Sequence, residues 1–187
     1  MSTPLFLLTL LTLIALLYVV IAATAYIRMR GVRVVVCPET ARPAAVTISA
    51  AGAALSAICE QPDLRVAQCS RWPERTACNE ACTAQVAVAP RETLAFSIVK
   101  RWYAGKTCAL CLEPIAPPPA VGAQPGLLNL ALTQPPDTIT WRGVSADELP
   151  SLFSTHLPVC ARCHVREQFG APARKTTKQA AAGAGTI

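Results

Sequence analysis

The chain has 187 residues, of which 52% are hydrophobic and 15% charged, with 17 basic against 11 acidic side chains. Soluble domains carry about 25% charged residues, so this composition excludes a disordered, acidic or coiled-coil protein. The length suits one modest domain, or two very small ones, beside a membrane segment. The surplus positive charge lies in two clusters: Arg28, Arg30 and Arg33, and Arg174, Lys175 and Lys178. The body between them is formally neutral, so no nucleic-acid partner is expected.

The first 33 residues predict a membrane anchor with juxtamembrane arginines. Residues 5–27 are 23 positions without a charge. As a helix they extend about 34 Å, which exceeds a hydrocarbon core of about 30 Å. The alternative is a cleaved signal peptide, because Ala23, Thr24 and Ala25 resemble a cleavage site. An uncleaved anchor is favoured, because residues 1–4 carry no positive charge and the apolar run exceeds the roughly 7–15 residues usual in signal peptides.

The arginines also predict the orientation of this anchor. Lys and Arg accumulate on the cytoplasmic side of membrane helices, and here they follow the apolar run, while none precedes it. The N-terminus is therefore expected outside, with a single pass through the inner (cytoplasmic) membrane and the soluble part in the cytoplasm. The membrane is the one partner that the sequence predicts. A protein partner is expected without being identified.

The soluble part predicts strands where β-branched residues cluster and helices where small or periodic apolar residues do. Strands are expected over 32–36, 45–49, 64–68 and 137–141, and helices over 50–58, 78–85, 91–103 and 165–169. A further helix is expected to follow a capping box at Ser145 and to run toward His156. The predicted organisation is an anchor (1–33), a first cysteine-rich subdomain with a knuckle-bearing helix (34–113), a Pro-rich linker (114–136), a C-terminal part (137–169) and a disordered tail (170–187). The expected class is α+β, with one transmembrane helix followed by a small cysteine-rich domain of zinc-ribbon or treble-clef type.

Two C-x-x-C pairs predict a zinc site. A cytoplasmic domain keeps its thiols reduced, so nine cysteines indicate metal binding rather than disulfides. Four thiolates about 2.3 Å from one ion complete a tetrahedral site. The pairs are Cys108 with Cys111 and Cys160 with Cys163, and the first resembles the knuckles of zinc-ribbon and treble-clef domains. The 48 residues between the pairs exceed the roughly 15–20 of the compact pattern, which a proline-rich insertion explains.

A second, looser set of cysteines follows predicted strand ends and one predicted helical turn. Cys78 and Cys82 are four residues apart and would share a helix face. Cys37 and Cys69 each follow an apolar run, and whether they join that pair stays open. Together the four would make a second closed zinc site, which Trp72 could cover. The alternative is that they are ordinary buried cysteines, as is expected for Cys59.

A haem or an iron–sulfur cluster is the competing cofactor. Cys160, Cys163 and His164 form a C-x-x-C-H motif, in which the cysteines would bind haem c covalently and the histidine would be its axial ligand. Four cysteines can also hold an iron–sulfur cluster. Haem attachment takes place outside the cytoplasmic membrane, on the opposite side from the predicted location. A methionine that could be the second axial ligand of a haem is also hard to find, because the only methionines, Met1 and Met29, lie in the anchor region.

As a whole the chain resembles uncharacterised bacterial single-span membrane proteins with paired C-x-x-C motifs. The matching stretches are 37–39, 69–74, 108–111 and 158–164. The resemblance implies no known activity, and the sequence offers no evident catalytic site, so an enzyme is not expected. The expected function is a membrane-anchored, zinc-stabilised binding or scaffold protein. The alternative is a membrane-tethered electron-transfer protein that carries haem c or an iron–sulfur cluster.

Overall fold

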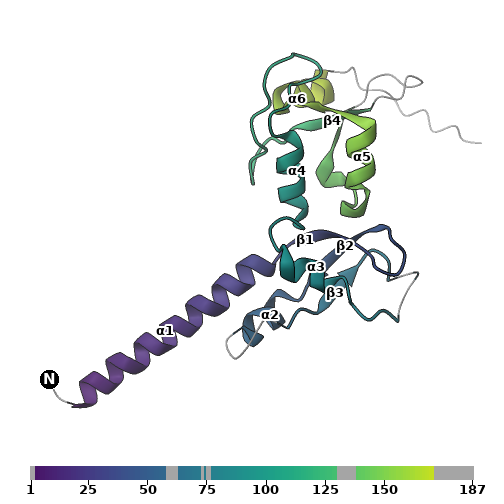
Figure 1. Cartoon of the computed structure of the whole chain (residues 1–187). Coiled ribbons are helices and arrows are strands. Elements are labelled where there is room, and N and C mark those ends of the chain that lie inside the picture. The colour runs from purple at the N-terminus through teal and green to yellow at the C-terminus, as the bar shows by residue number, and fades with distance from the viewer. Residues whose placement is uncertain (1–2, 58–62, 73, 75–76, 130–137, 171–187) are drawn as a thin grey trace, which may run out of the picture.

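A long helix projects from a body of two lobes (Figure 1). The computed structural model describes residues 3–57, 63–72, 74, 77–129 and 138–170. Each lobe contains a three-stranded antiparallel sheet, so the class is α+β as predicted. We call the lobe that runs from β1 to α3 the N-lobe, and the lobe that runs from α4 to α6 the C-lobe. The predicted tail lies outside the described residues, except for its first position.

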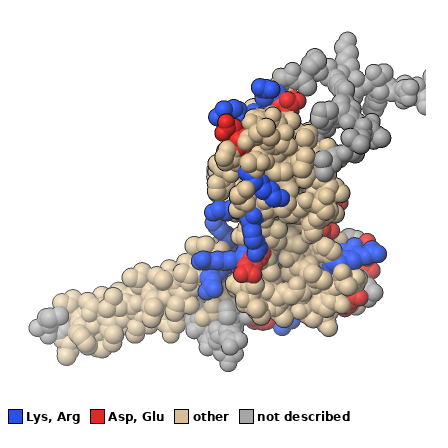
Figure 2. All heavy atoms as spheres, turned by 45° about the horizontal axis from the view of Figure 1, so that its top comes forward, with Lys and Arg blue, Asp and Glu red and all other residues tan. Residues whose placement is uncertain are grey.

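The projecting helix is α1 (Thr3–Met29), and it confirms the predicted apolar helix. Among the described residues it is the one helix long and apolar enough to cross a membrane, a criterion that a signal sequence also meets. Figure 2 shows its visible face free of charged side chains up to the junction with the body. Its last turns are partly covered, because Ile21, Ala22 and Ala25 are half-buried and Met29 joins the N-lobe core.

The N-lobe sheet has the strand order β1-β2-β3. Its strands are β1 (Val32–Val36), β2 (Pro43–Ile48) and β3 (Val66–Cys69). They agree with the predicted strands to within two residues at each end, because each is a short run of β-branched or alternating residues. Helix α2 (Ala50–Ser56) packs alongside α1, and α3 (Thr83–Val88) closes the lobe.

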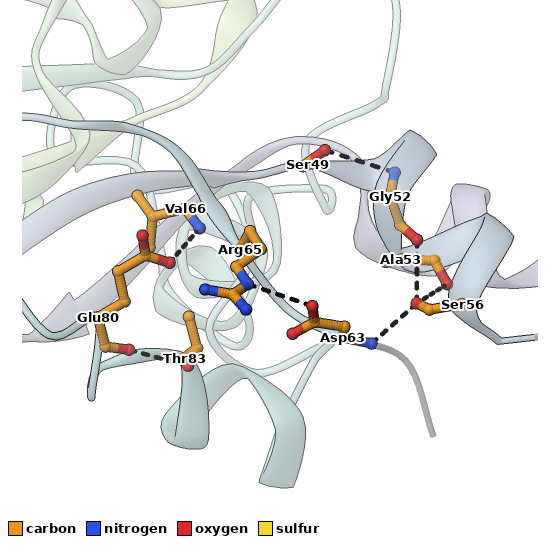
Figure 3. Close-up of polar contacts among 9 residues, drawn as sticks. All are labelled: Ser49, Gly52, Ala53, Ser56, Asp63, Arg65, Val66, Glu80 and Thr83. Carbon is orange, nitrogen blue, oxygen red and sulfur yellow. Dashed lines mark hydrogen bonds and ion pairs between the residues drawn. The ribbon is translucent and has the colours of Figure 1, made fainter. Parts of the chain in front are cut away.

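The helix predicted over 78–85 is wrong at its start. Glu80 has φ of +56°, which no helix accommodates, so the chain turns there and α3 begins only at Thr83. The Glu80 carboxylate accepts a hydrogen bond of 2.8 Å from the Val66 amide, and its carbonyl accepts one of 2.8 Å from the Thr83 hydroxyl (Figure 3). A tertiary contact with β3 therefore overrides local helix propensity between Cys78 and Cys82.

The C-lobe sheet has the order β5-β4-β6. Its strands are β4 (Gly126–Asn129), β5 (Thr138–Thr140) and β6 (His156–Val159). The helices are α4 (Ala95–Tyr103), α5 (Leu149–Thr155) and α6 (Ala161–Gly170), with single 3₁₀ turns at Trp141–Gly143 and Ala146–Glu148.

Three assignments change in this lobe. The central strand β4 lies inside the range predicted as a linker, and its Leu127 is fully buried. Helix α4 packs with β4 and β6 in one core, so the knuckle-bearing helix belongs with the C-terminal part of the chain rather than with residues 34–94. Helix α6 also begins four residues earlier than predicted, directly after Cys160.

Arg33 connects α1 to both the sheet and the loop before α4. Its side chain is fully buried, which corrects its assignment to the juxtamembrane surface cluster; Arg28 and Arg30 remain exposed. The guanidinium donates to the carbonyls of Arg28 and Pro90 and, at 3.2 Å, to the Thr93 hydroxyl. Because the Arg28 carbonyl belongs to the last turn of α1, Arg33 caps that helix and fixes its direction against the body.

Replacing Arg33 should therefore destabilise the body. Arg33→Leu removes a charged donor and leaves buried carbonyls without it, so the free energy of unfolding should fall by about 3 kcal/mol. Arg30→Leu, at an exposed site, should change it by less than about 0.5 kcal/mol. Urea unfolding of the full chain in detergent, followed by tryptophan fluorescence, measures both. Equal midpoints for the two variants would contradict the role assigned to Arg33.

Candidate metal centre

The first arm of the centre is a tight turn after α4. Gly105 leaves the helix with φ of +71°, and the chain forms a hairpin in which Thr107 pairs with Pro114. Within it the Cys108 amide donates to the Glu113 carbonyl at 2.8 Å, and the Leu112 amide donates to the Cys108 carbonyl at 2.9 Å. Leu112 has φ of +61°, which closes the turn. The result is the knuckle expected from the sequence.

The second arm is the junction between β6 and α6. Cys160 precedes the first residue of α6, and its sulfur accepts a 3.5 Å hydrogen bond from the Cys163 amide. This is how an N-cap side chain satisfies a free amide at a helix start. Two further bonds join the arms: the Ala109 amide donates to the Pro158 carbonyl at 2.9 Å, and the Cys160 amide to the Cys108 sulfur at 3.2 Å.

The four predicted cysteines of the two C-x-x-C pairs come together at this junction. The sulfurs of Cys108, Cys111, Cys160 and Cys163 all lie within 4.8 Å of one another. The Cys111 and Cys160 sulfurs are 3.8 Å apart, and a tetrahedron with metal–sulfur bonds of about 2.3 Å has an edge of about 3.8 Å. Cys108 and Cys163 are buried and Cys111 is exposed. The set can hold one metal ion just beneath the surface.

The thiols of Cys108 and Cys163 differ in pKa. Burial raises the pKa of Cys108, but hydrogen bonds from three backbone amides outweigh burial and lower the pKa to about 6. The donors are the amides of Cys160, Cys111 and Leu110. Burial and the neighbouring thiols raise the pKa of Cys163 to about 12. The first thiolate therefore opposes the ionisation of the others, and a divalent cation at the centre would remove this repulsion, since cysteines bind metals as thiolates.

His164 contacts the sheet and is not one of the clustered ligands. Its side chain is buried, and Nδ1 lies 2.9 Å from the Thr138 hydroxyl oxygen. A Cβ atom built on Gly126 would stand 2.4 Å from the same Nδ1. The imidazole therefore packs directly on the backbone of β4 and positions the first turn of α6.

Sequence reasoning did not identify Gly126 or Tyr103 as supports of the site. The Tyr103 hydroxyl donates to the Gly126 carbonyl at 2.8 Å, and the side chain is fully buried. A side chain at position 126 would separate β4 from α6. The sequence does contain one signal for this contact. Gly126 stands at the start of an apolar run, and a glycine in a strand often marks a place where another segment approaches the backbone closely.

The second predicted set surrounds one small cavity of the N-lobe. Cys37, Cys69, Cys78 and Cys82 all line a cavity of about 20 Å³. Burial raises the pKa of Cys82 to about 11, and the other three thiols add to the rise. These sulfurs are spaced more widely than those of the first set, which alone among the described residues brings its ligand atoms within 4.8 Å. Cys59 lies outside the described residues.

The contact between Gly126 and His164 leads to a matched test. Gly126→Ala should lower the free energy of unfolding by about 3 kcal/mol, because the new methyl group overlaps a packed ring. It should also weaken the binding of a metal ion by the four cysteines, since His164 follows Cys163. Gly143→Ala meets no atom within 4 Å and should change neither quantity. Urea unfolding and competition with a chelator measure the two effects, and similar results for both variants would contradict the assigned packing.

Comparison with protein-family models, with curated proteins and with solved structures found no match to the chain. Two features of the chain itself bear on its function, the donor set and α1. The donor set is four cysteines that can hold a metal ion, and α1 is a helix long and apolar enough to cross a membrane.

Proposed function

We propose that the protein is a membrane-anchored binding or scaffold protein whose C-lobe is stabilised by one zinc ion. The ligands are Cys108, Cys111, Cys160 and Cys163. The observation that supports this most directly is the sulfur geometry, with a separation of 3.8 Å that equals one edge of a zinc–thiolate tetrahedron. Four protein ligands leave no position for the water that a catalytic zinc site retains, so the ion has a structural role.

The spacing and packing of the site favour zinc over the two competing cofactors. An iron–sulfur cluster distributes its four thiolates over separate iron atoms, which requires wider separations than one tetrahedral edge. Haem would take Cys160 and Cys163 away from the other two thiols. It would also require His164 to leave its contacts with Thr138 and β4.

The packing of α1 supports an anchor that is retained. The cleavage-like triplet Ala23, Thr24 and Ala25 lies inside the helix, and Ala25 is half-buried where α2 packs alongside. Met29 belongs to the N-lobe core, so removing α1 would expose apolar surface of the body. Arg28 and Arg30 are exposed at the end of the apolar run, where the positive-inside rule assigns the body to the cytoplasm. The resemblance to bacterial single-span proteins fits this arrangement.

The zinc assignment predicts that single ligand changes release the ion from the C-lobe. Cys111→Ser changes an exposed ligand, so loss of zinc should precede any packing defect, and Cys163→Ser should act in the same way. Cys59→Ser, outside both cysteine sets, should keep the wild-type content. Elemental analysis and absorption spectroscopy of the full chain in detergent measure the result. A Soret band, or the broad absorption of an iron–sulfur cluster, would overturn zinc in favour of electron transfer.

The anchor assignment predicts a single-pass protein with its N-terminal residues intact. The chain should stay with the membrane after an alkaline carbonate wash, and its intact mass should include residues 1–25. A C-terminal reporter that is active only in the cytoplasm should be active. A mass that begins after Ala25, or activity of a reporter that needs an oxidising compartment, would show that the anchor or its orientation is wrong.

A further inference from the structure

We propose that Cys37, Cys69, Cys78 and Cys82 form a second zinc site, independent of the first, in the N-lobe. The sequence grouped these cysteines only loosely. The structure adds a backbone turn with the same hydrogen-bonding pattern as the knuckle at Cys108, contacts that hold the segments carrying the other three thiols, and one cavity that all four thiols line. The proposal goes beyond the proposed function, which requires one ion in the other lobe.

The turn at Cys37 repeats the hydrogen-bonding pattern of the knuckle at Cys108. The Cys37 amide donates to the Arg42 carbonyl at 2.9 Å, and the Ala41 amide donates to the Cys37 carbonyl at 2.8 Å. In the C-lobe the same two bonds, five and four residues long, measure 2.8 and 2.9 Å. The residue four positions after each first cysteine has a positive φ, 51° at Ala41 and 61° at Leu112.

The residues that flank the two turns also pair in the same register. Val36 pairs with Pro43 across the N-lobe turn, and Thr107 pairs with Pro114 across the other. In both turns the paired residues are the one before the cysteine and the one six positions after it. The equivalence places Thr40 at the position of Cys111. The N-lobe thus has a knuckle with one cysteine instead of two, which must take its other ligands from elsewhere.

Backbone amides of the turn lie beside the Cys37 sulfur. They belong to Thr40 and Glu39. Amides of the same turn act on the sulfur of Cys108 in the C-lobe. Such donors stabilise the charged sulfur that a metal requires.

The segments that carry the other three thiols are held in the N-lobe by contacts that do not involve a metal. Cys69 ends β3, and its backbone pairs with Val46 of β2. The turn between Cys78 and Cys82 is fixed to β3 by the hydrogen bond from Val66 to Glu80 (Figure 3). The Glu80 amide donates to the Cys78 sulfur at 3.3 Å, a further amide–sulfur bond of the kind found in the first centre.

The four N-lobe thiols line one cavity, and an ion bound there would draw together sulfurs that lie farther apart than those of the first centre. The cavity volume of about 20 Å³ is close to that of one water-sized sphere, for which about 10–15 Å³ suffices. Trp72, Arg71 and Glu39 line it as well. Arg71 brings one positive charge to the lining and Glu39 one negative charge. Arg71 also pairs with Glu74 at 3.4 Å.

Two measurements on the wild-type full chain in detergent test the proposal. Elemental analysis should find about two zinc ions per chain, one for each set of four thiols. Alkylation of the zinc-loaded protein, followed by peptide mass spectrometry, should leave the four N-lobe cysteines unlabelled until a chelator is added. Labelling of these four while Cys108, Cys111, Cys160 and Cys163 stay protected would overturn the second site and leave the proposed function intact. Protection that only a reductant removes would also overturn it, because it would indicate disulfides.

A rescue experiment tests the equivalence of the two turns. Cys69→Ser should reduce the zinc content from about two ions to about one, since three thiolates close a tetrahedral site incompletely. Adding Thr40→Cys to this variant places a thiol at the position that Cys111 occupies in the other knuckle, and should restore the second ion. Cys59→Ser is the control and should keep both ions. If Thr40→Cys restores nothing while the C-lobe keeps its zinc, the equivalence on which the second site rests is wrong.

Discussion

The convergence of four thiols on one point is the constraint on which the C-lobe depends. It joins a hairpin turn to the start of α6 across 48 intervening residues, and the chain between them supplies β4, β5 and α5. The core beneath is small, with Tyr103, Leu127 and Leu149 as its largest fully buried side chains. A lobe of this size buries little apolar surface, so a metal ion held by these four thiols would contribute a large share of its stability.

Strand β1 connects α1 to both lobes. Val35 belongs to the N-lobe core, Val34 packs against the C-lobe core, and Arg33 caps the end of α1. The Val34 amide also donates to the Thr93 carbonyl just before α4 at 2.7 Å. Because the same five-residue strand makes all these contacts, the body cannot turn about the end of α1 without breaking buried hydrogen bonds. The position of the two lobes relative to a membrane therefore follows from the direction of α1.

Local signals in the sequence predicted local features. The apolar run of α1, the β-branched residues of β1 and the two C-x-x-C pairs each depend on neighbours in the chain, and each lies where it was expected. The predictions were wrong where a contact with a distant segment determines the local secondary structure. The Pro-rich surroundings of Gly126–Asn129 suggested a linker, but β6 pairs with that segment and makes it a central strand. Residues 78–82 have helical spacing, but the bond between Glu80 and β3 requires a turn.

The sequence by itself determined the kinds of chemistry available to this protein: a helix long enough to span a membrane, and thiols in pairs that a metal can bind. These features depend on composition and on the spacing of residues that lie close together in the chain. Only the tertiary structure decided which thiols meet, that Arg33 is buried against α1, and that the Cys37 turn matches the Cys108 knuckle. The physical reason is that hydrogen bonds and packing between distant segments set these positions, and no pattern along the chain encodes such partners.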